Sequence, residues 1–258
     1  MSDVQTAVRK RIEGLSETDK CNILVVGTEP ATFVNSMEMS VTGRWPNLGV
    51  SGGGVQDTTR CLNRFDMFPH IEGLSGKVAC LGLSLEEKGD MSAAELEQTL
   101  RGVHTDVKID MVVFTCPSND HVPVDVLEGV KRGVDKTNRN VPIFLFMTKQ
   151  SNRAPTKPMK ENMQKAQKDL DIAAEDCRFI QLYQFQTQGS EVSQKTIDQP
   201  LLKFWDKILS VKDKDKQEDP KHSVKDQDKQ EDLKHSPQWT RDLVDLGISR
   251  QFCYSKIR

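Results

Sequence analysis

The apolar positions of this chain form short runs separated by stretches of helical spacing, and the run at residues 23–26 is the most informative. Its sequence, ILVV, is typical of a strand buried on both faces of a parallel sheet. Gly27 ends the run, residues 28–30 have turn chemistry, and residues 31–39 have the spacing of a helix. A strand, a tight turn and a helix N-terminus form the place where α/β proteins bind phosphate, because free N–H groups and the helix dipole point there.

The same pattern predicts further elements on both sides of this unit. Strands are expected over residues 61–67, 78–81, 109–115, 141–147 and 178–183, and helices over residues 4–15, 92–101, 122–137, 156–171 and 200–209. The 61–67 strand alternates as an edge strand does, and Ser92 with Glu95 forms a capping box. Strands separated by helices predict an α/β fold of three layers, with a mainly parallel sheet and helices on both faces.

The composition changes abruptly at residue 211. Residues 211–223 (VKDKDKQEDPKHS) are followed by a near copy at 224–236 (VKDQDKQEDLKHS), and this repeat has almost nothing apolar to bury. We expect disorder or a solvated helix there. Residues 237–258 regain apolar side chains, and either fold back or act as a docking peptide on a polar tether. The expected organisation is an N-terminal helix (1–20), an α/β domain (21–210), a charged linker (211–236) and a C-terminal segment (237–258).

Composition limits the classes of function. A net charge of -2 and an isoelectric point near 6.2 give no global attraction to nucleic acid or to anionic membranes. No apolar stretch is long enough to predict a membrane span, and the charged N-terminus lacks the apolar core of a secretion signal. The six cysteines are scattered without a CxxC pair, which favours reduced, buried thiols over disulfides or a zinc site. These features indicate a soluble cytoplasmic protein.

The turn after Gly27 has the frame of a phosphate-binding loop without its chemistry. A working P-loop has the sequence GxxxxGK[ST], in which glycines let backbone N–H groups surround the phosphates and a lysine reaches them. Counted from Gly27, the second glycine is replaced by Thr32, the lysine by Phe33 and the hydroxyl residue by Val34. An ADP- or GDP-like ligand held by Gly27, Thr28 and the helix start alone stays an open alternative.

Two further places match the positions of guanine-nucleotide chemistry before and after the 78–81 strand. Thr58 and Thr59 lie in a glycine-rich loop, where a threonine would hold magnesium over the γ-phosphate. An Asp-x-x-Gly is expected near the end of the 78–81 strand, where its aspartate would support the magnesium ion. Here Gly82 is present and the aspartate is absent.

The strand over 141–147 ends where a guanine-reading [NT]KxD would stand. Thr148 and Lys149 match its first two positions, and Ser151 replaces its aspartate. A serine cannot make the charged bidentate contact to a guanine base. The sequence therefore predicts a vestigial nucleotide pocket, with no catalytic residue and no metal ligand assigned.

Over about residues 20–210 the chain resembles the interferon-induced protein 44 family of GTPase-like proteins. The resemblance includes Phe33, Asn35 and Ser36 after the P-loop, the stretch GLSLEEKGDMSAAELEQTLRGVH (residues 82–104), the Thr-Lys pair, and Asp198 with Leu201 and Leu202 in the last helix. It implies a P-loop GTPase-like fold and a setting in cytoplasmic innate immunity. The family P-loop, GxxGAGKSS, is about three residues longer and has the glycines and lysine that this chain lacks.

Three hypotheses follow from these observations. The first is a pseudo-GTPase, an interaction scaffold that binds unidentified protein partners or its own copies and needs no cofactor. The second is a GTP-binding protein of relaxed motifs, which would use GTP or GDP with Mg²⁺. The third is an adaptor that works through its C-terminal tail. We favour the first, because each lost charged contact removes about 1.5–3 kcal/mol and three such contacts plus the glycine cradle are missing.

Overall fold

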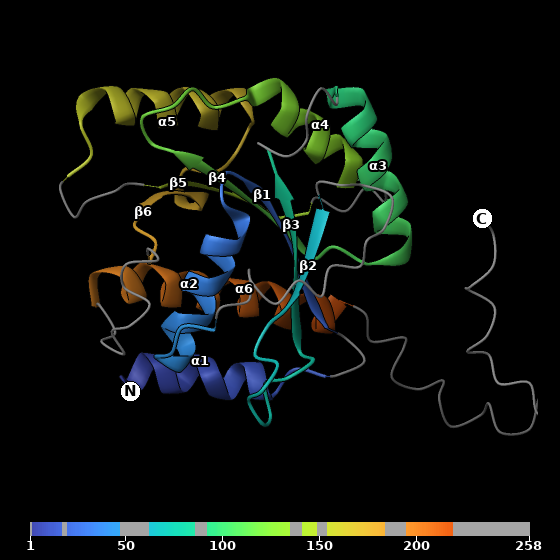
Figure 1. Ribbon diagram of the computed structural model, residues 1–258, viewed down its shortest axis with the longest axis vertical. Helices are drawn as coiled ribbons and strands as arrows, with labels where there is room; N and C mark the ends of the chain where they lie inside the picture. The colour runs from blue at the N-terminus through green and yellow to red at the C-terminus, as the bar shows by residue number, and fades with distance from the viewer. Residues whose placement is uncertain are drawn as a thin grey trace, which may run out of the picture. The chain divides into compact units, whose positions relative to one another are not determined.

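A computed structural model of the chain describes residues 2–16, 20–46, 62–85, 92–134, 141–148, 154–183 and 195–218. Its centre is a six-stranded sheet with the order β2-β3-β1-β4-β5-β6, and helices cover both faces (Figure 1). The described residues up to Lys212 belong to one compact unit, and a second unit begins at Asp213. In the part of the chain that the structure describes, no helix combines the length and apolarity that crossing a membrane requires.

The sheet is parallel except at one edge. Its strands are β1 (Cys21–Gly27), β2 (Leu62–Asp66), β3 (Val78–Ser84), β4 (Met111–Pro117), β5 (Ile143–Thr148) and β6 (Cys177–Ile180). Only β2 runs antiparallel, paired with β3, while β1 lies between β3 and β4 at the centre. The central strand is buried almost throughout, which explains its continuous apolar run.

Helices form the two outer layers, and the sheet between them divides the core in two. They are α1 (Asp3–Glu13), α2 (Pro30–Thr42), α3 (Ala93–Asp106), α4 (Val124–Val134), α5 (Lys157–Asp169) and α6 (Lys195–Glu218), with a short 3-10 turn, η1 (Ala174–Asp176), before β6. Buried residues of α1, α2 and α6 pack on one face of the sheet. Buried residues of α3, α4 and α5 pack on the other face. The three-layer α/β fold class predicted from the sequence is therefore confirmed.

Most predicted elements are observed with shifted ends. The capping box is present, since the Glu95 N–H donates to Ser92 Oγ at 3.3 Å and the Ser92 N–H donates to the Glu95 carboxylate at 2.8 Å. The strand predicted over 78–81 continues to Ser84, because leucine and glycine positions beyond 81 are also buried between the two helix layers. The last helix begins at Lys195, earlier than the predicted 200–209, and includes Pro200.

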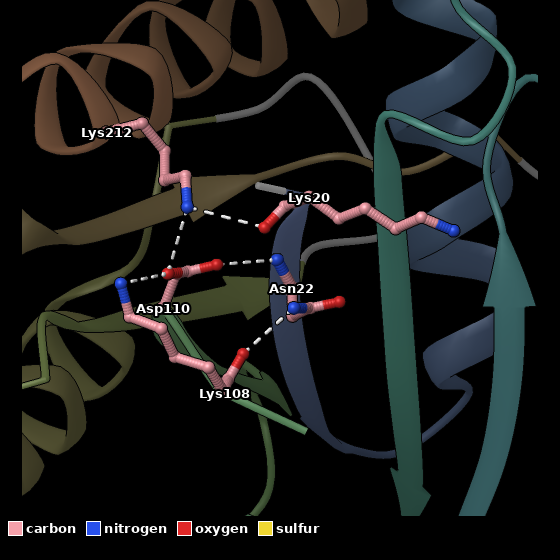
Figure 2. A network of polar contacts seen from close by, with 5 residues as sticks. All are labelled: Lys20, Asn22, Lys108, Asp110 and Lys212. Atoms are coloured by element: carbon pink, nitrogen blue, oxygen red, sulfur yellow. Dashed lines mark hydrogen bonds and ion pairs between the residues drawn. The ribbon is translucent and has the colours of Figure 1, made fainter. Parts of the chain in front are cut away.

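The start of the charged repeat is helical. Helix α6 continues through residue 211 to Glu218, so residues 211–218 extend the helix expected to end at 209. Lys212, the second residue of the repeat, is buried and lies 3.2 Å from the carboxylate of Asp110 (Figure 2). Residues 211–218 are thus helical, which is one of the two expected states, but Lys212 is buried rather than solvated, because a buried carboxylate compensates its charge.

Candidate functional site

The carboxyl ends of β1, β3, β4 and β5 lie side by side at one edge of the sheet. Gly27 is the register partner of both Ser84 and Thr115. On the next pair of strands, Pro117 is the partner of Thr148. This edge is where open α/β sheets bind ligands. The structure therefore places Gly27 and Thr148, which the sequence puts at strand ends, on the same side of the sheet and two strands apart.

Gly27 is required by the packing of β4. Its φ angle is 154°, and a Cβ atom built on it would lie 1.9 Å from the carbonyl oxygen of Thr115. No side chain fits in that space, since the blocking atom belongs to the backbone. The glycine at the start of the turn is thus explained by a contact between strands, without any ligand.

The backbone of Thr28 is bonded to the same threonine. The Thr28 N–H donates to the Thr115 carbonyl at 3.3 Å, and the Thr115 hydroxyl lies 3.5 Å from the Thr28 carbonyl. The Gly27 carbonyl accepts the N–H of Leu85 at 3.0 Å. The turn is held against its neighbours by these bonds, so the N–H of Thr28 is not directed to a phosphate.

The N-terminus of α2 offers few donors to an anion. Pro30, the first helical residue, has no N–H, and the N–H groups of Thr32 and Phe33 both donate to the Glu29 carbonyl, at 3.0 and 3.3 Å. Glu29 is exposed, has a left-handed conformation with a φ of 52°, and makes no side-chain cap. Its negative charge at the helix start disfavours a second anion there. In the described turn, only Glu29 and Ala31 keep an N–H without a partner.

The position counted as the P-loop lysine belongs to the core. Phe33 is fully buried, and its ring stacks on Phe146 with ring centres 5.8 Å apart. Val34, at the hydroxyl position, is also fully buried. These two side chains belong to the core beneath α2, so neither is available to contact a phosphate.

Gly82 lies inside β3 rather than after it. A Cβ atom on Gly82 would lie 2.6 Å from the ring of Phe65 and 3.2 Å from Cβ of Pro30. Two side chains thus fill the space beside this glycine, one from β2 and one from α2. The described structure explains Gly82 by this close packing.

Thr148 ends β5 and joins it to β4. Its hydroxyl donates to the Cys116 carbonyl at 3.4 Å, and its own carbonyl accepts the N–H of Ser118 at 2.9 Å. The remaining predicted pocket residues, Thr58, Thr59, Lys149 and Ser151, lie outside the described residues.

Sequence reasoning missed Gln181 at this edge. It follows β6 directly, one residue after Ile180, which is the register partner of Thr148. Its Oε1 atom is buried and, within the described residues, accepts no hydrogen bond. A buried amide oxygen without a hydrogen-bond donor is costly, so this position suits a ligand that donates a hydrogen bond. The sequence signal was only its place just after a strand.

The described cysteines are unsuited to nucleophilic chemistry. Cys21, Cys80, Cys116 and Cys177 are buried thiols, as the sequence predicts for strand-associated cysteines. Burial, assisted by Asp120, raises the pKa of Cys116 to about 12. Burial, assisted by Asp176, raises the pKa of Cys177 to about 11. Both thiols are protonated at neutral pH, and a thiol is a weak nucleophile. Among the described side chains there is also no cluster of His, Cys, Asp and Glu suited to a metal ion.

The strand order, the single antiparallel edge strand and the strand-turn-helix unit at Gly27 belong together. Together they make a three-layer α/β fold with a mainly parallel sheet, the fold class that the sequence predicts.

The chain is similar to several solved structures but matches no known sequence family. No family model and no curated protein sequence matches the chain. Era of Aquifex aeolicus bound to GDP and aluminium fluoride is similar in structure, with a TM-score of 0.38, 12% identity, and coverage of 74% of this chain and 56% of Era. Era with MgGDPNP and nucleotides of 16S ribosomal RNA gives a TM-score of 0.38, 11% identity, and coverage of 75% and 57%.

A small COPII coat GTPase, SAR1 of Encephalitozoon cuniculi in complex with GDP, is also similar in structure. Its TM-score is 0.39 and its identity 11%, with coverage of 83% of this chain and 90% of that protein. This chain spans little more than half the length of Era. The likeness concerns the fold, and the ligands of these proteins are not carried over to this chain.

Proposed function

We propose that this protein is a pseudo-GTPase of the interferon-induced protein 44 type, a GTPase-like domain that acts as a protein-interaction scaffold in cytoplasmic innate immunity. The observation that carries the proposal is the state of the turn between β1 and α2. Of its backbone donors, Thr28, Thr32 and Phe33 are bonded within the protein, and Pro30 has none. A triphosphate would have to break these bonds before it gained its own.

The missing charges support the same proposal. The lysine position is occupied by the buried Phe33, the Asp-x-x-Gly aspartate is absent, and Ser151 replaces the guanine-reading aspartate. Each charged hydrogen bond is worth about 1.5–3 kcal/mol, so three such losses reduce affinity by a factor of about 10³ or more. Phosphoryl transfer needs the lysine and the magnesium ion even more than binding does.

Isothermal titration calorimetry of the full chain with GTP, GDP and ATP, with and without Mg²⁺, tests the proposal. We expect no saturable heat up to about 100 µM nucleotide, because the cradle and its charges are missing. Magnesium-dependent GTP binding with a Kd of about 1 µM would overturn it. A thermal-shift measurement on the same samples is the control, since any ligand of the folded state raises the midpoint.

A second candidate, a GTP-binding protein of relaxed motifs, is favoured by one observation. Gln181 follows Ile180, the register partner of Thr148 at the end of β5, and its buried Oε1 has no hydrogen-bond partner among the described residues, so it could accept a hydrogen bond from a base. If a nucleotide binds there, the Gln181→Ala variant should lose the heat seen with the natural chain. If Gln181 has no ligand, the variant and the natural chain should give the same flat titration.

The third candidate is an adaptor that works through its C-terminal tail. A truncation that tests it should begin after Glu218, because Lys212 is buried and α6 continues to that residue. Loss of partner capture by the truncated chain, with its thermal midpoint unchanged, would support the adaptor. Undiminished capture would favour the domain itself as the interaction surface.

A further inference from the structure

A groove runs along the free edge of the sheet beside β6. Its volume is about 670 Å³, and it is lined by Cys177, Arg178 and Phe179 of β6, Met163 of α5, and residues of α6 that include Gln199 and Lys203. Figure 1 shows β6 at the end of the sheet, between α5 in one helix layer and α6 in the other. The floor of the groove is therefore a strand, and its walls are the two helix layers.

Among the described strands, β6 has a strand neighbour on one side only. It pairs in parallel with β5, and it ends the strand order of the described sheet. Successive residues of a strand direct their backbone groups to alternate sides, so an edge strand leaves about half of its N–H and C=O groups for another strand. Within the described residues, no turn, cap or side-chain hydrogen bond reaches the backbone of Arg178 or Phe179.

The two walls of the groove differ in chemistry. Met163 and Phe179 are partly buried and pack against the core on the α5 side. Arg178 points to the opposite face from Phe179, because neighbouring strand residues alternate, and so lies on the side of α6 with Lys203. The groove thus has an apolar wall and a basic wall.

The cations of the basic wall are available. Arg178 and Lys203 are exposed, and neither has an ion-pair partner among the described residues. Asp176 lies two residues before Arg178, just ahead of β6, and is paired with Lys207. Among the described residues that line the groove, none is acidic. Its charge therefore matches an acidic occupant.

We propose that this groove binds an extended acidic segment of a partner protein, which adds a strand to the edge of β6. Side chains of an added strand alternate between the two walls, so the matching segment alternates apolar residues with Asp or Glu. Its backbone pairs with β6, its apolar side chains contact Met163 and Phe179, and its carboxylates contact Arg178 and Lys203. This inference rests on the proposed scaffold role, for which it names a surface and the chemistry of a partner.

Fluorescence anisotropy with labelled peptides tests the inference on the full chain. The probe is a peptide of about eight residues in which valine and aspartate alternate. A control peptide has the same composition in two blocks, and a second control replaces aspartate by lysine. We expect the alternating acidic peptide to bind with a Kd on the order of 10 µM, and both controls to bind at least about tenfold more weakly.

Charge-reversal variants locate the binding. Arg178→Glu and Lys203→Glu should each weaken binding of the acidic peptide about tenfold or more, and the double variant should bind the lysine peptide instead. Lys165→Glu on α5 is the matched control, because Lys165 is exposed, has no ion-pair partner in the described part of the chain and does not line the groove. All these side chains are exposed, so the variants should keep the thermal midpoint of the natural chain.

Several outcomes would overturn the inference. The first is an absence of saturation up to about 1 mM peptide, which would leave Arg178 as a guard against strand pairing. The second is equal weakening by Lys165→Glu, which indicates general charge attraction. The third is a concentration-dependent dimer that Arg178→Glu dissociates, which identifies a second copy as the occupant. Nucleotide titration of the same samples separates the two proposals, since peptide binding together with tight GTP binding would overturn only the pseudo-GTPase.

Discussion

Lys212 and Asp110 form an ion pair in which both side chains are buried, with Lys212 Nζ 3.2 Å from Asp110 Oδ1. The other carboxylate oxygen of Asp110 accepts the N–H of Asn22 at 2.8 Å, and Lys212 also donates to the Lys20 carbonyl at 3.3 Å (Figure 2). The pair joins α6 at Lys212 to the ends of β1 and β4 where these strands begin. The charged repeat therefore starts from a fixed point on the domain.

Replacing Lys212 by methionine should destabilise the fold by about 3 kcal/mol, because it leaves the Asp110 carboxylate buried without its main cation. Lys108→Met is the control, since Lys108 lies 3.4 Å from the same carboxylate and its side chain is 52% exposed. That variant should lose less than about 1 kcal/mol. Urea unfolding measures both, and equal losses would contradict the role given to Lys212.

Gly27→Ala should destabilise the protein by more than about 3 kcal/mol, because the new methyl group overlaps the Thr115 backbone. Gly43→Ala is the matched control. Gly43 has a φ of 72°, and a Cβ atom there would meet nothing within 4 Å. Its cost should be only the strain of a left-handed alanine, about 1–2 kcal/mol. Similar urea midpoints for the two variants would show that Thr115 yields to the methyl group.

Glu38 should make stability fall as pH rises. It is buried in α2, where desolvation raises the pKa of its carboxyl group from 4.5 to about 7, opposed by a hydrogen bond from the Phe68 N–H at 2.8 Å. The folded state therefore binds the extra proton, and this contribution is complete below pH 4.5 and is lost as pH rises through about 7. Its full size is about 3 kcal/mol at most. Glu38→Gln should flatten the stability profile measured by urea unfolding between about pH 5 and pH 8.

Glu95 provides the control of opposite sign for this measurement. Hydrogen bonds from the Ser92 backbone N–H and hydroxyl lower the pKa of Glu95. Its contribution is present above the pKa of an ordinary glutamate and is lost as pH falls through the lowered value. Glu95→Gln should therefore change stability only at acidic pH. A flattened profile in that variant near pH 7 would contradict the assignment to Glu38.

Tyr183→Phe should cost about 1.5–3 kcal/mol, because its hydroxyl donates to the Asp198 carboxylate at 2.6 Å and both side chains are buried. Asp198 belongs to the stretch with Leu201 and Leu202 on which the family resemblance partly rests, and all three are buried here. Gln199→Ala on the exposed side of the same helix should change stability by less than about 0.5 kcal/mol. A neutral Tyr183→Phe would mean that Asp198 is satisfied by its other contacts.

The candidate site could be predicted from the sequence only in part. Apolar runs ending in Gly27 and Thr148 indicate buried strands, and parallel strands bring their carboxyl ends together. The strand ends do lie side by side, but whether a nucleotide site stands there stays a prediction. Sequence reasoning could not assign the extent of β3, and so it placed Gly82 after a strand rather than within one. It also missed Gln181. Whether a buried amide oxygen has a hydrogen-bond donor depends on the residues that fold around it, and the sequence does not show these.

The sequence alone determined the order and type of the elements. It also determined the charged repeat and the missing lysine and aspartates, because each of these features depends on neighbouring residues or on composition. Only the tertiary structure decided why two glycines are needed, since Thr115 faces Gly27 while Pro30 and Phe65 face Gly82. It also decided that Lys212 is buried against Asp110. These contacts join residues far apart in the chain, and their energies depend on distances that no local pattern records.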